Sequence, residues 1–403
     1  MSSLSPKPGV TSIEQGTLFT RRFFLLCAFT FATFVSAFLL FPTMPLRILA
    51  LGGTKSDAGL FLGLLTYASA FSAPIGGALA DRIGKRPVLL ISSAAILCFV
   101  LIYSSTRSLT VILLTALVHG VFWSALLAAS AALISDTIPP DRRAEGIGYW
   151  GFASIVAVAV APPLGLLLLR VGWALLCLLS AVLGLGMFAV AFSLSERSAA
   201  HAWSLAGFFS GGLIERDVFV LAITLFLYSF GYGGVMSFVP LYAQESGVGF
   251  RGVYFVAFTV TVLLTRPYLV RRADRKGAPR ILLPLLGLTA AGFGILAISG
   301  RLPYLLASGI VFGTGFGSAY PVFASYMLSK IDPARRGAAF GSILLAFDTG
   351  IGSGSMLLGI IIENHGYRPA FALASLLALC AIPYFLLVRR TLPRFRDPHA
   401  ESQ

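Results

Sequence analysis

The sequence predicts an all-α membrane protein with twelve transmembrane helices, arranged as two six-helix bundles related by pseudo-two-fold symmetry. Three observations predict this class: the composition, the spacing of the apolar runs and an internal repeat. Of the 403 residues, 57% are hydrophobic and only 11% are charged, whereas about 25% are charged in a typical soluble domain. Such a chain cannot cover its surface with polar groups in water, but lipid tolerates an apolar surface.

Twelve apolar runs are long enough to cross a bilayer, which takes about 20 mainly apolar residues in a helix. Most connections between them are short. We expect spans at 23–42, 58–80, 87–105, 109–135, 146–169, 172–193, 218–241, 252–270, 281–299, 303–328, 338–362 and 367–388.

The loop charges predict the orientation. Loops on the side of the N-terminus hold 22 Lys and Arg residues, the opposite loops hold seven, and Arg266 lies inside a span. Cytoplasmic loops carry the excess of basic residues in membrane proteins. We therefore expect a multi-pass protein of the inner (plasma) membrane with both termini in the cytoplasm.

An internal repeat divides the chain into two halves. At an offset of 193 residues, Asp81 falls on Asp274, Arg82 on Arg275 and Gly84 on Gly277. A parallel repeat of this kind is a plan that transporters use to rock one half against the other. We expect a cytoplasmic tail at 1–22, a bundle at 23–193, a cytoplasmic linker at 194–217, a bundle at 218–388 and a cytoplasmic tail at 389–403.

The linker is polar, with apolar residues interleaved, and these could lay a short helix on the membrane surface. They are Trp203, Leu205, Phe208, Phe209 and Leu213.

Several other classes of protein are disfavoured. The net charge of +14 does not indicate nucleic-acid binding, because the basic residues form short clusters between apolar runs. The four cysteines have no metal-ligand spacing and are expected to be free core thiols. No catalytic motif is visible, so we expect no enzyme activity, metal or cofactor. We also expect the protein to be a monomer. The cysteines are Cys27, Cys98, Cys177 and Cys380.

The loop after the second span carries the most specific motif. It reads Gly77-Ala-Leu-Ala-Asp81-Arg82-Ile-Gly84-Lys85-Arg86 and resembles the signature loop of the major facilitator superfamily, G-x-x-x-D-R-x-G-x-R/K. A cytoplasmic turn needs Gly84, basic residues hold it at the inner surface, and Asp81 at the membrane edge needs a partner. The positive N-terminus of the eleventh helix, near residues 337–341, can supply that partner.

This resemblance implies a cytoplasmic gate. In the family the aspartate at the position of Asp81 latches the two halves together, and Asp136 occupies the position of an acid that joins a charge relay with Lys85. The alternative is a solvated, positively charged turn. The gating residues that the resemblance and the repeat indicate are Gly77, Asp81, Arg82, Gly84, Lys85, Arg86, Asp136, Asp274, Arg275 and Gly277.

Two further segments resemble those of bacterial drug–proton antiporters. The first span ends Phe41-Pro42-Thr-Met-Pro45, similar to P-x-x-P, and the fifth contains Ala161-Pro162-Pro163-Leu-Gly165, similar to G-P-x-x-G-G. Ala161 and Leu166 replace two glycines of the second pattern. The antiporter arginine of the fourth span is replaced by Ala116, so its role in proton transfer is not carried over.

Three ionisable residues lie within spans, where such groups are costly and are functional candidates by default. Asp348 lies ten residues into the eleventh span, about 15 Å deep at 1.5 Å per residue. Desolvation favours the neutral acid there, which suits a proton carrier, although a structural hydrogen bond is the alternative. His119 can relay protons or pack in the core. Arg266, about one turn inside the eighth span, can pair with Asp348, bind an anionic substrate or snorkel to the cytoplasmic surface.

Aromatic pairs spaced by four residues are candidates for a substrate cavity, although packing is the simpler reading of any single ring. The candidate cavity residues are Tyr67, His119, Trp123, Tyr228, Tyr232, Phe316 and Tyr320.

These observations favour a secondary transporter that exports a small amphipathic or hydrophobic molecule in exchange for protons by alternating access. Its expected partners are that small molecule, protons and the lipid bilayer. One alternative is proton-coupled uptake of a nutrient such as a sugar or an organic acid. Another, from a different class, is a membrane sensor or enzyme without transport.

Overall fold

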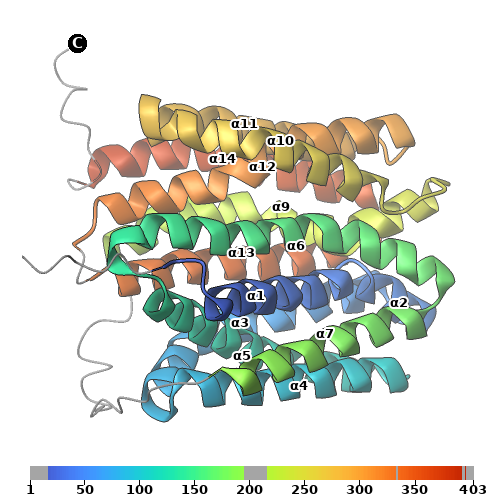
Figure 1. Cartoon of the computed structure of the whole chain (residues 1–403). Helices are drawn as coiled ribbons and strands as arrows, with labels where there is room; N and C mark the ends of the chain where they lie inside the picture. Colours follow the sequence, from blue (N-terminus) through green and yellow to red (C-terminus); the bar gives the residue numbers. More distant parts are fainter. Residues whose placement is uncertain (1–16, 195–215, 333–334, 393–394, 396–403) are drawn as a thin grey trace, which may run out of the picture.

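The computed structural model describes residues 17–194, 216–332, 335–392 and 395 (Figure 1). Within these residues it contains twelve helices long and apolar enough to span a membrane. The helices run alongside one another, and the first residue of α1 and the last residue of α14 lie at the same end of the molecule, here called the terminal end. Their bounds are α1 Arg21–Leu40, α2 Met44–Ala50, α3 Lys55–Ile83, α4 Lys85–Ser105, α5 Leu109–Thr137, α6 Arg143–Val171, α7 Trp173–Ser193, α9 Arg216–Glu245, α10 Val253–Lys276, α11 Ala278–Ile298, α12 Leu302–Ser329, α13 Arg336–His365 and α14 Tyr367–Thr391, with a short 3₁₀ turn, η1, at Pro140–Arg142.

All twelve predicted spans are present, and the first is longer than predicted. It continues beyond residue 42 as α2, so that the whole span covers Arg21–Ala50. Thr43 at the junction donates its hydroxyl to the backbone oxygen of Leu39 at 2.7 Å, and Pro45 lies in the first turn of α2. Proline is tolerated there because the first turn of a helix needs no backbone donor. The predicted linker helix lies outside the described residues.

The two halves use the same packing plan, which is the structural counterpart of the sequence repeat. In the N-terminal half, α1–α7, the pairs α3–α5, α1–α6 and α4–α7 are in contact. In the C-terminal half, α9–α14, the corresponding pairs are α10–α12, α9–α13 and α11–α14. The predicted pair of six-helix bundles is therefore present.

Turns between helices repeat as well. Gly84 joins α3 to α4 with a φ of 97°, and Gly277 joins α10 to α11 with a φ of 88°. Only glycine adopts this left-handed region routinely. The loop motif thus has a local conformational reason to keep a glycine at this position in both halves.

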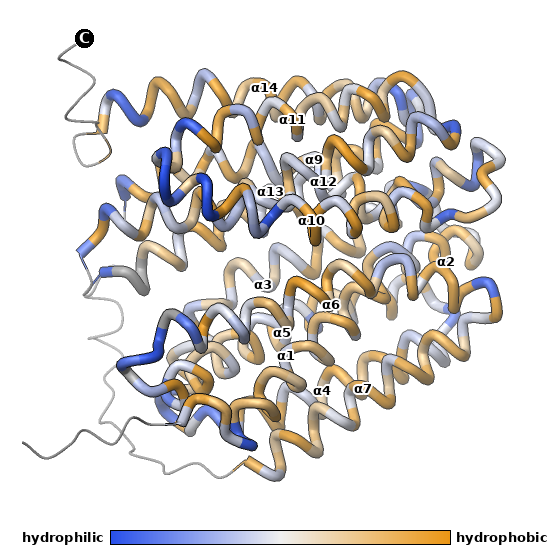
Figure 2. The backbone as a smooth tube through the Cα atoms, turned by 45° about the horizontal axis from the view of Figure 1, so that its top comes forward, coloured by the Kyte–Doolittle hydropathy of each residue, from blue (hydrophilic) through white to orange (hydrophobic). Residues whose placement is uncertain are grey.

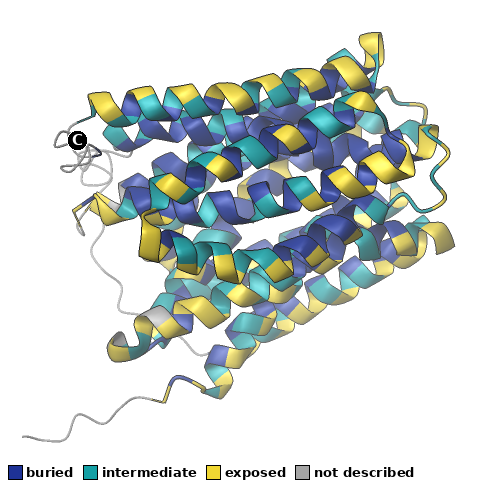
Figure 3. Cartoon of the chain, turned by 90° about the horizontal axis from the view of Figure 1, so that it is seen from above, coloured by how far each residue is buried: buried dark blue, intermediate teal, exposed yellow. Residues whose placement is uncertain are grey.

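The outer faces of the bundles are apolar, as a lipid environment requires. Val171, Leu264 and Phe192 are 76%, 74% and 66% exposed. Exposed residues follow the outward sides of the helices while buried residues lie between them (Figure 3), and hydrophilic segments gather towards the helix ends (Figure 2).

The prediction of four core thiols needs correction. All four cysteines are free, but only Cys177 is buried and Cys27 is half-buried. Cys98 and Cys380 are exposed on the outer surface, because an apolar run does not distinguish a lipid-facing position from a core position.

Candidate functional site between the two halves

The two halves meet mainly along α3 and α13, at the end of the molecule opposite the termini. There the helices approach closely enough to exclude side chains. A Cβ added at Gly63 would collide with Met356, and one at Gly359 would lie 2.9 Å from the backbone oxygen of Lys55. A second contact joins α6 to α10, where Thr259 donates its hydroxyl to the backbone oxygen of Ala159.

The same faces are apart at the end that carries the termini. Gly59 and Gly77 lie eighteen residues apart on α3, which is five turns at 3.6 residues per turn, so they share one face. A Cβ at Gly59 would strike the backbone of Ser355, whereas one at Gly77 would meet nothing within 4 Å. Gly148 and Gly151 of α6 also face open space. The structure is therefore closed at the far end and open at the terminal end.

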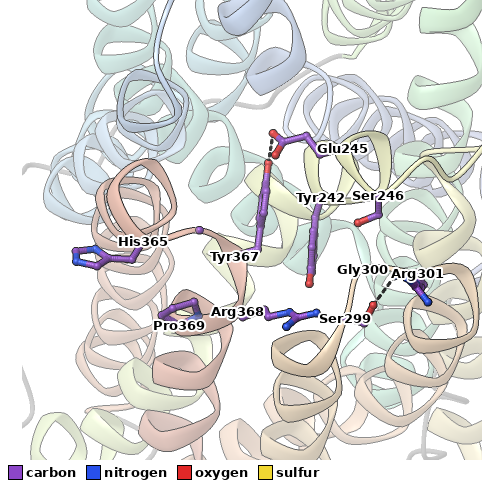
Figure 4. Close-up of a pocket in the computed structure, with 11 residues that line it drawn as sticks. Tyr242, Glu245, Ser246, Ser299, Gly300, Arg301, His365, Tyr367, Arg368 and Pro369 are labelled. Atoms are coloured by element: carbon purple, nitrogen blue, oxygen red, sulfur yellow. Dashed lines mark hydrogen bonds between the residues drawn. The ribbon is translucent and has the colours of Figure 1, made fainter.

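Charged groups fasten the closed end. Lys55 of α3 forms an ion pair with Glu245 of α9 at 2.9 Å, and its backbone N–H donates to Glu363 of α13 at 2.6 Å. Tyr367 of α14 donates its hydroxyl to Glu245 at 2.6 Å, as Figure 4 shows, and its ring lies 4.6 Å from the Lys55 ammonium. One lysine of the N-terminal half thus binds three helices of the other half.

A pocket of about 670 Å³ lies beside this network. Its lining includes Tyr242, Arg301 and Arg368 and comes from the C-terminal half alone (Figure 4). None of the predicted cavity residues lines it.

Asp348 lies at the level where the close contact between the two halves ends. Ser69, the middle residue of α3, donates its hydroxyl to the Asp348 carboxylate at 3.2 Å. On the closed-end side of this bond, Tyr67 and Ser353 share a hydrogen bond of 2.7 Å. Asp348 is half-buried, and four residues after it a Cβ at Gly352 would meet Thr66 and Tyr67. Positions four apart share a helix face, so Asp348 faces the other half.

Arg266 lies deeper than predicted. The eighth helix does not end at residue 270 but continues as α10 to Lys276, so Arg266 lies ten residues from its end instead of one turn. That corresponds to about 15 Å. In the described part of the chain, Arg266 forms no ion pair with Asp348, but Tyr320 of α12 lies within electrostatic range of both.

Four of the predicted cavity aromatics belong to the C-terminal half and pack within it: Tyr228, Tyr232, Phe316 and Tyr320. Tyr228 is fully buried, stacks on Phe316 at 4.5 Å and donates its hydroxyl to the backbone oxygen of Phe316 at 2.5 Å. Tyr232 stacks on the same ring at 4.3 Å. Tyr320 is half-buried and lies 4.7 Å from the ring of Phe347. Of the four, Tyr320 has the position best suited to meet a ligand.

His119 and Trp123 lie within the N-terminal half. The His119 ring is 5.3 Å from the ring of Phe99, and its Nδ1 lies 3.4 Å from the hydroxyl of Tyr103, both on α4. Trp123 packs edge-on against Phe34 of α1 at 5.6 Å. The structure therefore does not group His119 with Asp348: the recorded partners of His119 belong to its own half.

The signature loop lies at the open end. Lys85 forms an ion pair with Asp136, and Arg86 donates to the backbone oxygen of Phe192 at 2.7 Å, at the C-terminal end of α7, where the helix dipole favours a cation. Asp81 is exposed and makes no hydrogen bond or ion pair with any described residue. Arg82, Asp274 and Arg275 are exposed too.

Sequence reasoning missed Ser69, Ser353, Lys55 and Glu245. Serines within apolar helices are common and usually bond to their own backbone, so nothing local distinguished Ser69 from its neighbours. Lys55 begins α3 and Glu245 ends α9, so the two residues lie at helix ends that are 190 residues apart in the sequence. In the sequence both residues border predicted spans, and this position was the only signal that could have drawn attention to them.

Comparison with known proteins agrees with this architecture. The family model described as Major Facilitator Superfamily matches residues 26–264 and 222–402. The staphylopine export protein of Staphylococcus aureus is 22% identical over 373 residues, covering 87% of this chain and 91% of that protein. The multidrug resistance protein MdtG of Proteus mirabilis is 22% identical over 370 residues, covering 88% and 92%.

A solved structure of the nucleoside transporter NupG has the same fold, with a TM-score of 0.75 at 14% identity over 91% of this chain and 100% of that one. The family model covers nearly all of the sequence, the motif loop lies at the expected turn, and twelve spans form two equivalent bundles. The chain therefore belongs to the major facilitator superfamily and is a multi-pass membrane transporter.

Proposed function

We propose that this transporter exports a small amphipathic or hydrophobic molecule in exchange for protons, with both termini in the cytoplasm and Asp348 as the proton carrier. The excess of basic residues in the loops at the terminal end supports the orientation. Two relatives that match most of the chain are named for export and for multidrug resistance, which supports export over nutrient uptake.

The observation that carries this proposal is the bond between Ser69 and Asp348. It crosses from α3 to α13 at 3.2 Å, at the level where the contact between the halves ends. A carboxyl group there gains or loses its proton in a half-buried, mainly apolar setting, where the charged form is costly. Because the ionised group accepts a stronger hydrogen bond than the neutral acid, its protonation changes the strength of the link between the halves.

This geometry supports transport by alternating access. With the terminal end open, the site exchanges molecules with the cytoplasm. Closure of that end requires the faces of α3 and α6 that carry Gly77 and Gly148 to approach the C-terminal half, and the far end must then separate. A proton on Asp348 and the exported molecule would favour opposite directions of this change, as exchange requires.

The test uses purified protein in proteoliposomes with an imposed pH gradient and a panel of amphipathic fluorescent dyes. Asp348→Asn is expected to bind dyes but to lose gradient-driven transport. Asp141→Asn, which changes an exposed acid of the terminal-end loop, is the matched control and should transport normally. Full gradient-driven transport by Asp348→Asn with an unshifted pH profile would overturn the proposal, and gradient-driven accumulation in the direction of the proton flux would favour uptake.

A further inference from the structure

Arg266 is directed towards the space between the halves. It follows Thr259 by seven residues on α10, nearly two full turns, so the two side chains share a helix face. Thr259 touches the backbone of Ala159 in the other half. Arg266 therefore lies on the inter-half face, on the terminal-end side of this contact, where the halves have separated.

This arginine has no counter-ion in the described part of the chain, where it makes neither a hydrogen bond nor an ion pair. Its guanidinium group is always charged in proteins, and it lies ten residues from the nearer end of α10. A charge at such depth normally has a partner. Arg266 is half-buried rather than sealed, so a molecule entering from the open end can supply one.

A carboxylate of opposite charge, that of Asp348, lies on α13 of the same half. Tyr320 is within electrostatic range of both Arg266 and Asp348, but the two charged groups do not form an ion pair within 4 Å. Both residues belong to the C-terminal half and both face the inter-half space. The rings of Tyr320 and Phe347, 4.7 Å apart, supply apolar surface beside these groups.

We infer that the transported molecule is an amphipathic zwitterion: its carboxylate binds Arg266, its ammonium group binds ionised Asp348, and its apolar part packs on Tyr320 and Phe347. Arginine suits a carboxylate because its donors form a planar fork. This inference rests on the proposed function, since it uses Asp348 as the exchanged group. A proton on Asp348 removes the site for the ammonium group, so proton and substrate compete.

Three dansyl probes test the inference because they differ in charge alone. Nε-dansyl-lysine is a zwitterion, dansylcadaverine is the same molecule without the carboxylate, and 6-(dansylamino)hexanoate is the same molecule without the amine. Binding to the protein in nanodiscs is read from dansyl fluorescence. We expect the zwitterion to bind about tenfold or more tightly than either of the other two, since each contact is a charge-assisted hydrogen bond.

Variants then assign each contact. Arg266→Gln should reduce binding of the zwitterion to that of dansylcadaverine and leave dansylcadaverine unchanged, whereas Arg266→Lys should keep part of the preference. Asp348→Asn should reduce binding of the zwitterion to that of the hexanoate. Arg271→Gln, an exposed arginine near the end of the same helix, is the control and should bind all three probes as the wild type does.

The inference is overturned if the wild type binds the three probes equally, or if Arg266→Gln weakens dansylcadaverine as much as the zwitterion. Its failure is distinct from failure of the proposed function. If the wild type shows no preference for the zwitterion but still exports dyes in response to a pH gradient, the substrate class alone is rejected. A clear zwitterion preference in a protein whose Asp348→Asn variant still couples to protons would reject the coupling role alone.

Discussion

The hydroxyl of Ser69 and the carboxylate of Asp348, 3.2 Å apart, join the middle of α3 to the middle of α13. From this pair to the far end the two helices are in close contact, and from this pair to the terminal end they are not. The pair therefore lies where the contact between the halves begins, and we expect its hydrogen bond to influence the balance between this conformation and one open at the far end.

Ser69→Ala should shift that balance towards opening of the far end. Hydrogen bonds between membrane helices contribute about 0.6 kcal/mol on average, which corresponds to roughly a threefold change in the ratio of conformers. Spin labels at Leu79 and Phe340, introduced into a cysteine-free protein, report the separation of α3 and α13. Ser375→Ala removes a serine that bonds within its own half at 2.8 Å and is the control. An identical distance distribution in all three proteins would show that the bond has no such role.

Lys55→Met should loosen the closed end more strongly. The substitution removes the ion pair to Glu245 and the charge above the Tyr367 ring, while the backbone bond to Glu363 remains. Exposed pairs contribute about 0.2–1 kcal/mol each, so we expect a several-fold increase in the conformer open at the far end, measured with the same label pair.

A charge exchange makes this prediction specific. Lys55→Glu should open the far end because it places two acids together, and combining it with Glu245→Lys should restore closure in a double-mutant cycle. Lys330→Met, at the exposed end of α12 near the termini, should have no effect. Additive effects of the two charge reversals would contradict a direct pair.

Gly77→Leu should trap the conformation seen here. The added side chain has room now, because a Cβ at this position meets nothing within 4 Å, but it would obstruct closure of the terminal end. Overpacking of a tight contact costs about 1–3 kcal/mol, so transport should fall about ten- to hundredfold while thermal stability and dye binding persist. Gly186→Leu, at an exposed and open position of α7, should transport normally. Normal transport by Gly77→Leu would mean that α3 does not approach the other half there.

His119→Gln should lower stability and leave proton coupling unchanged. The His119 side chain is 2% exposed and lies among Phe99 and Tyr103 of its own half, where a poorly fitting polar replacement costs about 1–3 kcal/mol. We expect a lower melting temperature of the purified protein with an unshifted pH profile of transport. A shifted profile at unchanged stability would return His119 to the group of coupling residues.

Local properties of the sequence were sufficient for the number of spans and for their approximate limits, because run length and charge do not depend on neighbours in space. The exceptions have a physical explanation. Arg266 was placed too near a helix end because charged residues from Arg271 onwards resemble a loop, although they form the last turns of α10. The continuation of the first span as α2 was not predicted because Pro42 and Pro45 resemble the end of a span.

The sequence by itself determined the twelve spans, the repeat, the signature loop and the candidacy of Asp348, since an acid deep in an apolar run is visible without a structure. Only the tertiary structure decided which side of each helix meets the other half. In the structure Asp348 accepts a hydrogen bond from Ser69, His119 packs against residues of its own half, and the two halves are in contact at the far end. Helix rotation and the tilt between halves depend on contacts between residues hundreds of positions apart, and hydrophobicity in lipid is nearly the same on both faces of a helix, so no pattern along the chain records them.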